Sequence, residues 1–111
     1  MRLRSDFFAA ALIRRCAVEG VVAVQRRRGS SESGAIFVKV DRLDGTADLY
    51  GPAPQSLMEE GDATRRFAAV MREAPAGEVE EKMRREARFD PDLWLIEIED
   101  REGRCFLDLA E

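Results

Sequence analysis

Apolar residues in the first part of the chain recur with the spacing of a helix. Five of them fall on one side of such a helix: Phe8, Ala9, Leu12, Ile13 and Cys16. Ser5 and Asp6 are typical of a helix start, where a hydroxyl caps the first turn and an acid complements the helix dipole. Because Gly20 is typical of a helix end, the pattern predicts a helix over residues 6–18.

Two β-strands are predicted next, one on each side of a polar loop. Residues 21–27 are a short segment that begins with β-branched valines, which is typical of a strand. Residues 35–41 place three β-branched residues on one face: Ile36, Val38 and Val40. Ala35 and Phe37 face the other way, which predicts that both faces of this strand are partly covered. Residues 29–34, Gly-Ser-Ser-Glu-Ser-Gly, have the composition of a flexible loop.

A β-hairpin is predicted around Asp44 and Gly45. Both central positions of a type I′ turn need positive φ, which an Asp-Gly pair tolerates well. The turn joins residues 35–43 to residues 46–50. Together with the strand before the loop, these segments are expected to form an antiparallel meander of three strands.

The second half of the chain predicts a further helix and three further strands. Residues 65–72 have the propensity of a helix. Three of their apolar residues alternate as in a strand, however: Phe67, Ala69 and Met71. We therefore expect a strand here. Residues 75–88 predict an outer helix with one apolar stripe: Val79, Met83 and Ala87. Three pairs of opposite charge four residues apart support it: Glu78–Lys82, Glu80–Arg84 and Glu81–Arg85. Residues 93–99 and 104–109 predict the last two strands.

These elements predict an α+β fold in the order α-β-β-β-β-α-β-β. We expect a two-layer domain, with a mostly antiparallel sheet of about five to six strands and two helices. The length of 111 residues suits a single domain over residues 1–111.

The composition, 45% apolar and 36% charged, is that of a folded globular protein. The longest apolar stretch, residues 7–13, is too short to span a bilayer. Asp6 and the lack of a cleavage motif also argue against a secretory signal. We therefore expect Cys16 and Cys105 to be free thiols in a reducing cytoplasm, with no membrane partner.

Several classes of enzyme are excluded by residues that the chain lacks. It has no histidine, which removes Ser–His and Cys–His pairs, histidine bases and histidine-bearing metal sites. It has neither a Walker A loop nor the GxGxxG of dinucleotide-binding proteins. Val22 stands where the phosphate loop of a cysteine phosphatase would need an arginine after Cys16. The sequence therefore favours a protein without enzymatic activity, cofactor or bound metal.

The N-terminal part of the chain is basic, although the net charge is −4. Five arginines form two clusters there: Arg14, Arg15, Arg26, Arg27 and Arg28. They suggest a patch for a phosphate-bearing partner, either a nucleic acid or an anionic ligand. No aromatic residues interleave with them, and a helix packed antiparallel on a strand would separate the clusters. A solvated charged face is therefore the simpler interpretation.

Residues 89–102 are rich in carboxylates, among them Asp90, Asp92, Glu97, Glu99 and Asp100. Alternation puts Glu97 and Glu99 on the same face of the strand. Paired carboxylates can bind Mg²⁺ or divide acid and base roles, which suggests a carboxylate–metal hydrolase through Asp92, Glu97 and Glu99. A nuclease of the Asp…Glu-x-Lys type would need lysine in place of Glu99, so solvent-facing acids are the simpler interpretation.

Residues 49–55, Leu-Tyr-Gly-Pro-Ala-Pro-Gln, contain the only tyrosine. Gly51 permits a sharp turn and the two prolines after it stiffen the backbone, so the segment is expected to end a strand. Tyr50 on a rigid rim would recognise a partner, with Gln55 beside it. The alternative is a buried tyrosine at a strand end.

Five stretches of the chain, among them MRLRSDFF, GAIFVKV, LYGPAPQ and RRF, resemble a small bacterial family of uncharacterised proteins, the domain of unknown function 1491. They are residues 1–8, 34–40, 49–55, 65–67 and 88–104. The resemblance covers nearly the whole chain and implies a cytoplasmic protein that stands alone. It implies no activity, cofactor or catalytic residue.

We interpret the chain as a non-enzymatic binding or interaction domain. Its partner would be an unknown protein or a second copy of itself, because exposed sheet edges must be covered or paired. The candidate binding residues are Tyr50, Gln55, Arg14, Arg15, Arg27 and Arg28. Binding of a nucleic acid or anionic ligand through the N-terminal arginines, and metal-dependent hydrolysis, are the two alternatives.

Overall fold

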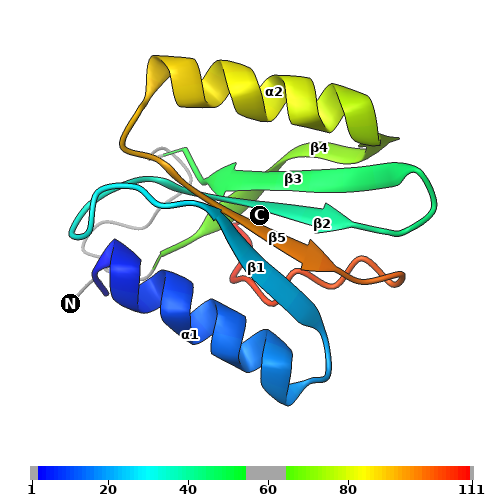
Figure 1. Ribbon diagram of the computed structural model, residues 1–111, viewed down its shortest axis with the longest axis horizontal. Helices are drawn as coiled ribbons and strands as arrows, with labels where there is room; N and C mark the ends of the chain where they lie inside the picture. Colours follow the sequence, from blue (N-terminus) through cyan, green and yellow to red (C-terminus); the bar gives the residue numbers. More distant parts are fainter. Residues whose placement is uncertain (1–2, 55–64, 111) are drawn as a thin grey trace.

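The computed structural model describes residues 3–54 and 65–110 (Figure 1). In chain order its elements are α1 (Ser5–Val18), β1 (Val22–Arg27), β2 (Ile36–Asp41), β3 (Thr46–Pro52), β4 (Phe67–Pro75), α2 (Ala76–Phe89) and β5 (Trp94–Glu99). The α+β class, both helices and the strand predicted at residues 65–72 are confirmed. The strand predicted at residues 104–109 is wrong, since in this segment only Leu109 forms a bridge, with Phe67.

The five strands form one mixed sheet in the order β1-β5-β2-β3-β4. β5 lies between β1 and β2, antiparallel to the first and parallel to the second. The β2–β3 hairpin is confirmed, but the predicted meander is wrong because β1 pairs with β5. Trp94 and Leu95 of β5 are both buried, on opposite faces of the sheet. A strand that buries both faces belongs in the interior of a sheet.

The loop between β1 and β2 is fixed by hydrogen bonds to the start of β5. Ser30 N donates to the Asp92 carbonyl at 2.9 Å, and the Trp94 indole Nε1 donates to the Ser30 carbonyl at 2.8 Å. A Cβ atom on Gly29 would lie 2.0 Å from the Asp92 carbonyl oxygen, so this crossing requires glycine. The loop is therefore ordered, although its composition predicts a flexible loop.

The same loop caps α1. The backbone N–H groups of Ser5 and Asp6 donate to the carbonyls of Glu32 and Ser31 at 3.2 and 3.0 Å. The Ser5 hydroxyl, expected as a cap, instead donates to the Gly34 carbonyl at 2.6 Å. The start of α1 is thus set by a loop that is distant in sequence.

The two helices lie on opposite faces of the sheet, as Figure 1 shows. α1 packs on β1 and β5, and α2 packs on β3 and β4. The predicted two-layer arrangement is wrong, because each side of the sheet carries its own apolar cluster and one helix cannot cover both. The C-terminal segment adds Cys105 and Leu107 to the cluster on the α1 side. On the other side, α2 leaves part of β1, β5 and β2 uncovered.

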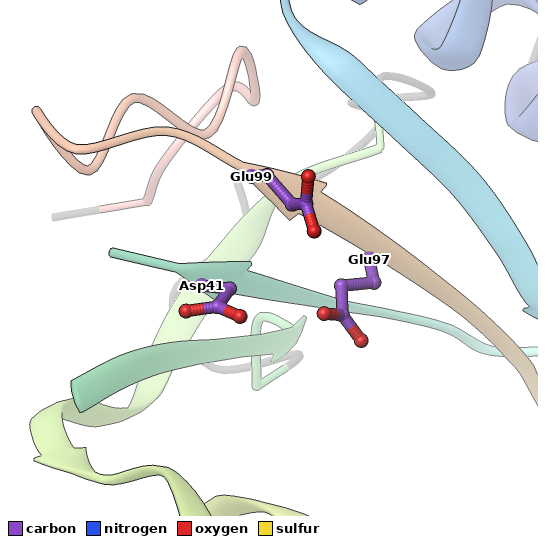
Figure 2. A group of neighbouring side chains, drawn as sticks. All are labelled: Asp41, Glu97 and Glu99. Atoms are coloured by element: carbon purple, nitrogen blue, oxygen red, sulfur yellow. The ribbon is translucent and has the colours of Figure 1, made fainter. Parts of the chain in front are cut away.

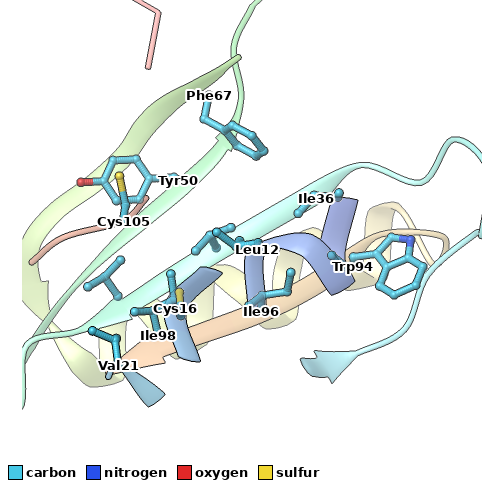
Figure 3. Packing of buried hydrophobic residues seen from close by; sticks show 13 residues of the cluster. Leu12, Cys16, Val21, Ile36, Tyr50, Phe67, Trp94, Ile96, Ile98 and Cys105 are labelled. Atoms are coloured by element: carbon cyan, nitrogen blue, oxygen red, sulfur yellow. The ribbon is translucent and has the colours of Figure 1, made fainter. Parts of the chain in front are cut away.

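The larger core lies on the α1 side, and Figure 3 shows how it is packed. Cys16 and Cys105 are both buried in it as free thiols, as expected. Burial raises the pKa of the Cys16 thiol, which keeps it protonated and unreactive.

The turn between β2 and β3 differs from the predicted type I′ turn. Positive φ occurs at Leu43 (62°) and Gly45 (90°), and Asp44 is not among the residues with positive φ. The Asp44 carboxylate instead accepts from the backbone N–H of Thr46 at 2.9 Å and from its hydroxyl at 2.6 Å. This side-chain turn holds the hairpin closed.

β3 continues through Gly51 and Pro52, where the sequence predicts its end. Both residues pair with β4, opposite Ala68 and Phe67. A Cβ atom on Gly51 would lie 2.7 Å from the ring of Phe37. Gly51 is therefore needed to make room for that ring and does not form a turn.

We predict that Gly51→Ala lowers the free energy of unfolding by about 1–3 kcal/mol, because the added methyl group overpacks against Phe37. Urea unfolding followed by circular dichroism measures it. Gly77→Ala in α2 is the control, since a Cβ atom there meets nothing within 4 Å. The control is expected to leave stability unchanged or raise it by up to about 1 kcal/mol. Equal stability of the two variants would contradict the packing role.

Candidate functional site

Charged side chains, with the exposed Val22 and Val24 of β1 beside them, occupy the part of the sheet that α2 leaves uncovered. They come from neighbouring strands and face the α2 side: Arg26 of β1, Lys39 and Asp41 of β2, and Glu97 and Glu99 of β5. β2 and β5 run parallel, with Lys39 opposite Glu97 and Asp41 opposite Glu99. Both strands carry apolar residues on this face only where α2 covers it. The pairing register therefore gathers the charges into one strip.

Glu80 of α2 reaches this strip and binds two cations. Its carboxylate accepts from Arg26 Nη1 at 2.7 Å and from Lys39 Nζ at 2.6 Å, while Glu97 accepts from Arg26 Nη1 at 2.9 Å. The hydrogen bond from Arg26, with that from Lys39, lowers the pKa of Glu80 to about 2. The predicted pair of Glu80 with Arg84 is wrong, because Glu80 turns toward the sheet. The network ties α2 to three strands.

The metal-hydrolase hypothesis names Asp92, Glu97 and Glu99, and the structure brings only the two glutamates together. The third carboxylate beside them is that of Asp41, with oxygens of all three within 4.8 Å of one another (Figure 2). Asp92 precedes β5, at the opposite end of the strand from Glu99. The place of a metal beside Glu97 is already taken by Arg26, so we assign no metal centre here.

A groove of about 290 Å³ opens between α2 and the end of β1. It is lined by seven residues: Arg26, Arg27, Glu80, Met83, Arg84, Ala87 and Leu95. Met83 and Leu95 are buried and form an apolar floor. Three guanidinium groups and one carboxylate surround it. We call this feature the α2–β1 groove.

A β-bulge explains why two consecutive arginines line the same groove. Alternation would send Arg26 and Arg27 to opposite faces of β1. The register of β1 with β5 shifts between Gln25 and Arg27, and such a bulge re-aims side chains. Arg27 then donates from Nη2 to the Pro91 carbonyl at 2.9 Å. Its Nε is buried and has no acceptor among the described residues.

The five N-terminal arginines do not form one patch. Arg14 and Arg15 lie near the C-terminal end of α1, where Arg15 stacks on an aromatic ring of the C-terminal segment. Arg28 lies near the other end of α1, bound to Ser31 in the loop that caps this helix. The two arginines of β1 line the groove on the opposite side of the sheet. Of the predicted binding residues, the groove therefore contains Arg27 alone.

Tyr50 is buried in the larger core with 2% of its surface exposed, beside Cys105 (Figure 3). Burial, with the nearby Cys105 and Asp48, raises the pKa of its hydroxyl. The alternative of a buried tyrosine is confirmed, and the side chain is too deep to contact a partner. Gln55 lies outside the described residues.

The sequence does not single out the groove residues of α2 and β5. It presents Met83 and Ala87 only as one stripe of an outer helix, and Arg84 only as half of a charged pair. The one signal is that Glu80, Met83, Arg84 and Ala87 share a side of the helix by their spacing. Which strand this side faces depends on the tertiary structure.

The family model described as a protein of unknown function (DUF1491) matches residues 3–108. The chain belongs to this family. A solution structure of protein Atu0922 from A. tumefaciens shares 42% identity, covers 100% of this chain and 97% of that one, and has a TM-score of 0.85. A crystal structure of a DUF1491 family protein from Caulobacter crescentus CB15 shares 38% identity over 100% of both chains, with a TM-score of 0.82. The resemblance inferred from the sequence is confirmed.

No curated protein matches the chain. In the part of the chain that the structure describes, no helix is long and apolar enough to cross a membrane.

We predict that Glu80→Gln lowers stability at neutral pH by about 1–2 kcal/mol, after allowing for solvent screening of the exposed Arg26. Because the pKa of Glu80 falls from 4.5 to about 2 on folding, its contribution is complete above pH 4.5 and is lost as the pH falls to about 2. The difference between the two proteins should therefore shrink over that window. Thermal melts from pH 7 to about 2 measure it.

Glu78→Gln is the matched control, since Glu78 is an exposed residue of the same helix and makes no ion pair among the described residues. It should leave the pH dependence of the parent chain unchanged. A Glu80→Gln variant with the same pH dependence as the parent would show that the network adds nothing to stability.

Proposed function

We propose that the chain is a non-enzymatic binding domain that holds an acidic segment of a partner protein in the α2–β1 groove. The observation that carries this proposal is the groove itself, in which the guanidinium groups of Arg27 and Arg84 lie beside an apolar floor, while Arg26 is already paired with Glu80 and Glu97. The reducing cytoplasm, suited to two free thiols, is part of the same proposal.

The chemistry of the groove favours a carboxylate-bearing segment with apolar side chains. Guanidinium groups bind carboxylates through two parallel hydrogen bonds. Met83 and Leu95 offer apolar surface between them, which an aliphatic side chain of the partner would bury. The groove of about 290 Å³ matches the smallest of the small-molecule sites, which measure about 300–1,000 Å³, but it is open to solvent where those sites enclose most of their ligand. An extended peptide suits such a shape better.

Arg27 has a specific reason to bind an added acceptor. Its buried Nε lacks a hydrogen-bond partner among the described residues, and an unsatisfied buried donor costs about 1–3 kcal/mol. A carboxylate placed in the groove would allow the guanidinium to turn and satisfy that donor. Arg84 is largely exposed and can follow, since among the described residues its one ion pair is with Glu81, on the surface of α2.

A nucleic acid is the less suitable partner. The strip next to the groove carries Asp41, Glu97 and Glu99, which would repel a phosphate backbone running across it. A short acidic segment meets the arginines without crossing this strip. The arginines at the two ends of α1 lie on the other side of the sheet and cannot extend the groove.

We predict that an acidic peptide of alternating glutamate and leucine binds the groove, and that Arg27→Ala weakens binding by about tenfold, the loss of one charge-assisted hydrogen bond. Titration of the ¹⁵N-labelled chain with the peptide, followed by NMR, measures the affinity and locates the binding site. Backbone amide chemical shifts are expected to change in β1, in the second half of α2 and at Leu95.

Arg101→Ala is the matched control, because Arg101 is an exposed arginine far from the groove lining. A peptide of serine and leucine tests the need for charge. The proposal would be overturned if the peptide changed chemical shifts only on other surfaces, or if Arg27→Ala and Arg101→Ala lost the same affinity for the peptide. An oligonucleotide that displaces the peptide at physiological salt would instead support the nucleic-acid alternative.

A further inference from the structure

The outer face of α1 is apolar, although no other described part of the chain covers it. Leu3, Phe7 and Val18 have 46%, 57% and 77% of their surface exposed, and Ala10 and Ala11 are exposed between them. By their spacing, Phe7, Ala10, Ala11 and Val18 form one stripe along α1, and Leu3 lies just before the helix, which begins at Ser5. α1 therefore has two apolar faces, and only the inner one is used in the fold.

The residues of this stripe have two-fold order along the helix. Leu3, two residues before the start of α1, and Val18, the last residue of α1, are both apolar and are equally far in sequence from the midpoint between Ala10 and Ala11. Phe7 and Arg14 also lie at equal distances from it, and they are a complementary pair, since a guanidinium group stacks on an aromatic ring. A stripe with this order is complementary to itself when a second copy is reversed.

We propose that two copies of the chain associate through α1, antiparallel about a two-fold axis at Ala10 and Ala11. The alanines let the two helices approach closely, as small residues do at helix crossings. Leu3 then packs near the partner's Val18, and Arg14 reaches the partner's Phe7 and the partner's Asp6. Symmetry makes each of these contacts twice.

The polar residues of the stripe are suited to these contacts. Arg14 is exposed and has no hydrogen bond or ion pair within the described residues. Both carboxylate oxygens of Asp6 accept from Arg4, at 3.2 and 3.1 Å, which lowers the pKa of the carboxyl. Arg14 of a second copy would share this carboxylate with Arg4. Phe7 already carries Arg4 on its ring at 5.1 Å, and much of it remains exposed.

This interface is independent of the proposed peptide groove. α1 and α2 lie on opposite faces of the sheet, so a dimer through α1 leaves the α2–β1 groove open (Figure 1). A contact between one pair of helices buries less surface than a standard interface, which buries about 1,600 Å². The dimer is therefore expected to be weak. Failure of either proposal would leave the other standing.

Sedimentation velocity from about 10 μM to about 1 mM tests the association. The parent chain should pass from monomer to dimer over this range. Phe7→Glu is expected to weaken the dimer at least tenfold, whereas Phe89→Glu should not change it, because Phe89 is 88% exposed on α2. A chain that stays monomeric throughout, or equal effects of the two variants, overturns the proposal.

A charge exchange tests the two-fold register. Asp6→Lys and Arg14→Glu should each weaken the homodimer, since each puts like charges together. A mixture of the two variants should restore association, because the lysine introduced in one copy then meets the glutamate introduced in the other. Thermal melts of each variant confirm that both remain folded. No recovery in the mixture of folded variants contradicts the register.

Cross-linking locates the axis. Ala10→Cys should form a disulfide-linked dimer under mild oxidation several times faster than Glu102→Cys, an exposed position remote from α1. Equal rates would exclude this axis. A monomeric chain that binds vesicles of anionic lipid through Phe7 would show that a membrane surface, and not a second copy, covers this face, and would also overturn the proposal.

Discussion

Burial of β5 on both faces is the constraint on which the other elements depend. Its side chains form part of both apolar clusters, so it has to lie inside the sheet with a helix on each side. Its position between β1 and β2 separates two strands that are neighbours in sequence. The loop that connects them then has to cross the start of β5, where Gly29 and the Trp94 indole hold it. The same loop caps α1.

Two helices are too few to cover both faces of a five-stranded sheet. The face left open beside α2 carries charged residues on β1, β2 and β5, which tolerate water, and two exposed valines of β1, Val22 and Val24. Arg26 and Lys39 neutralise Glu80 and Glu97 there, and this network fixes α2 at one distance from the strip. The groove is the space that remains between α2 and the bulged end of β1.

The two surfaces for which we propose a function both follow from incomplete coverage of the sheet and of α1. The α2–β1 groove and the outer face of α1 lie on opposite sides of the sheet. A binding domain that is also a weak dimer would present two such grooves at once, which raises its avidity for a partner with repeated acidic segments. The family to which the chain belongs shares this fold across relatives from two bacteria.

The sequence by itself determined the helices, five strands, the β2–β3 hairpin and the missing histidine chemistry, because spacing and composition act within a few residues. Only the tertiary structure decided that β1 pairs with β5, that Tyr50 is buried and that Asp41 joins Glu97 and Glu99. It also brought Arg27 to Met83 and Arg84. These outcomes depend on which strand fills the centre of the sheet, and that choice is made by burial summed over the whole chain, which local patterns do not contain.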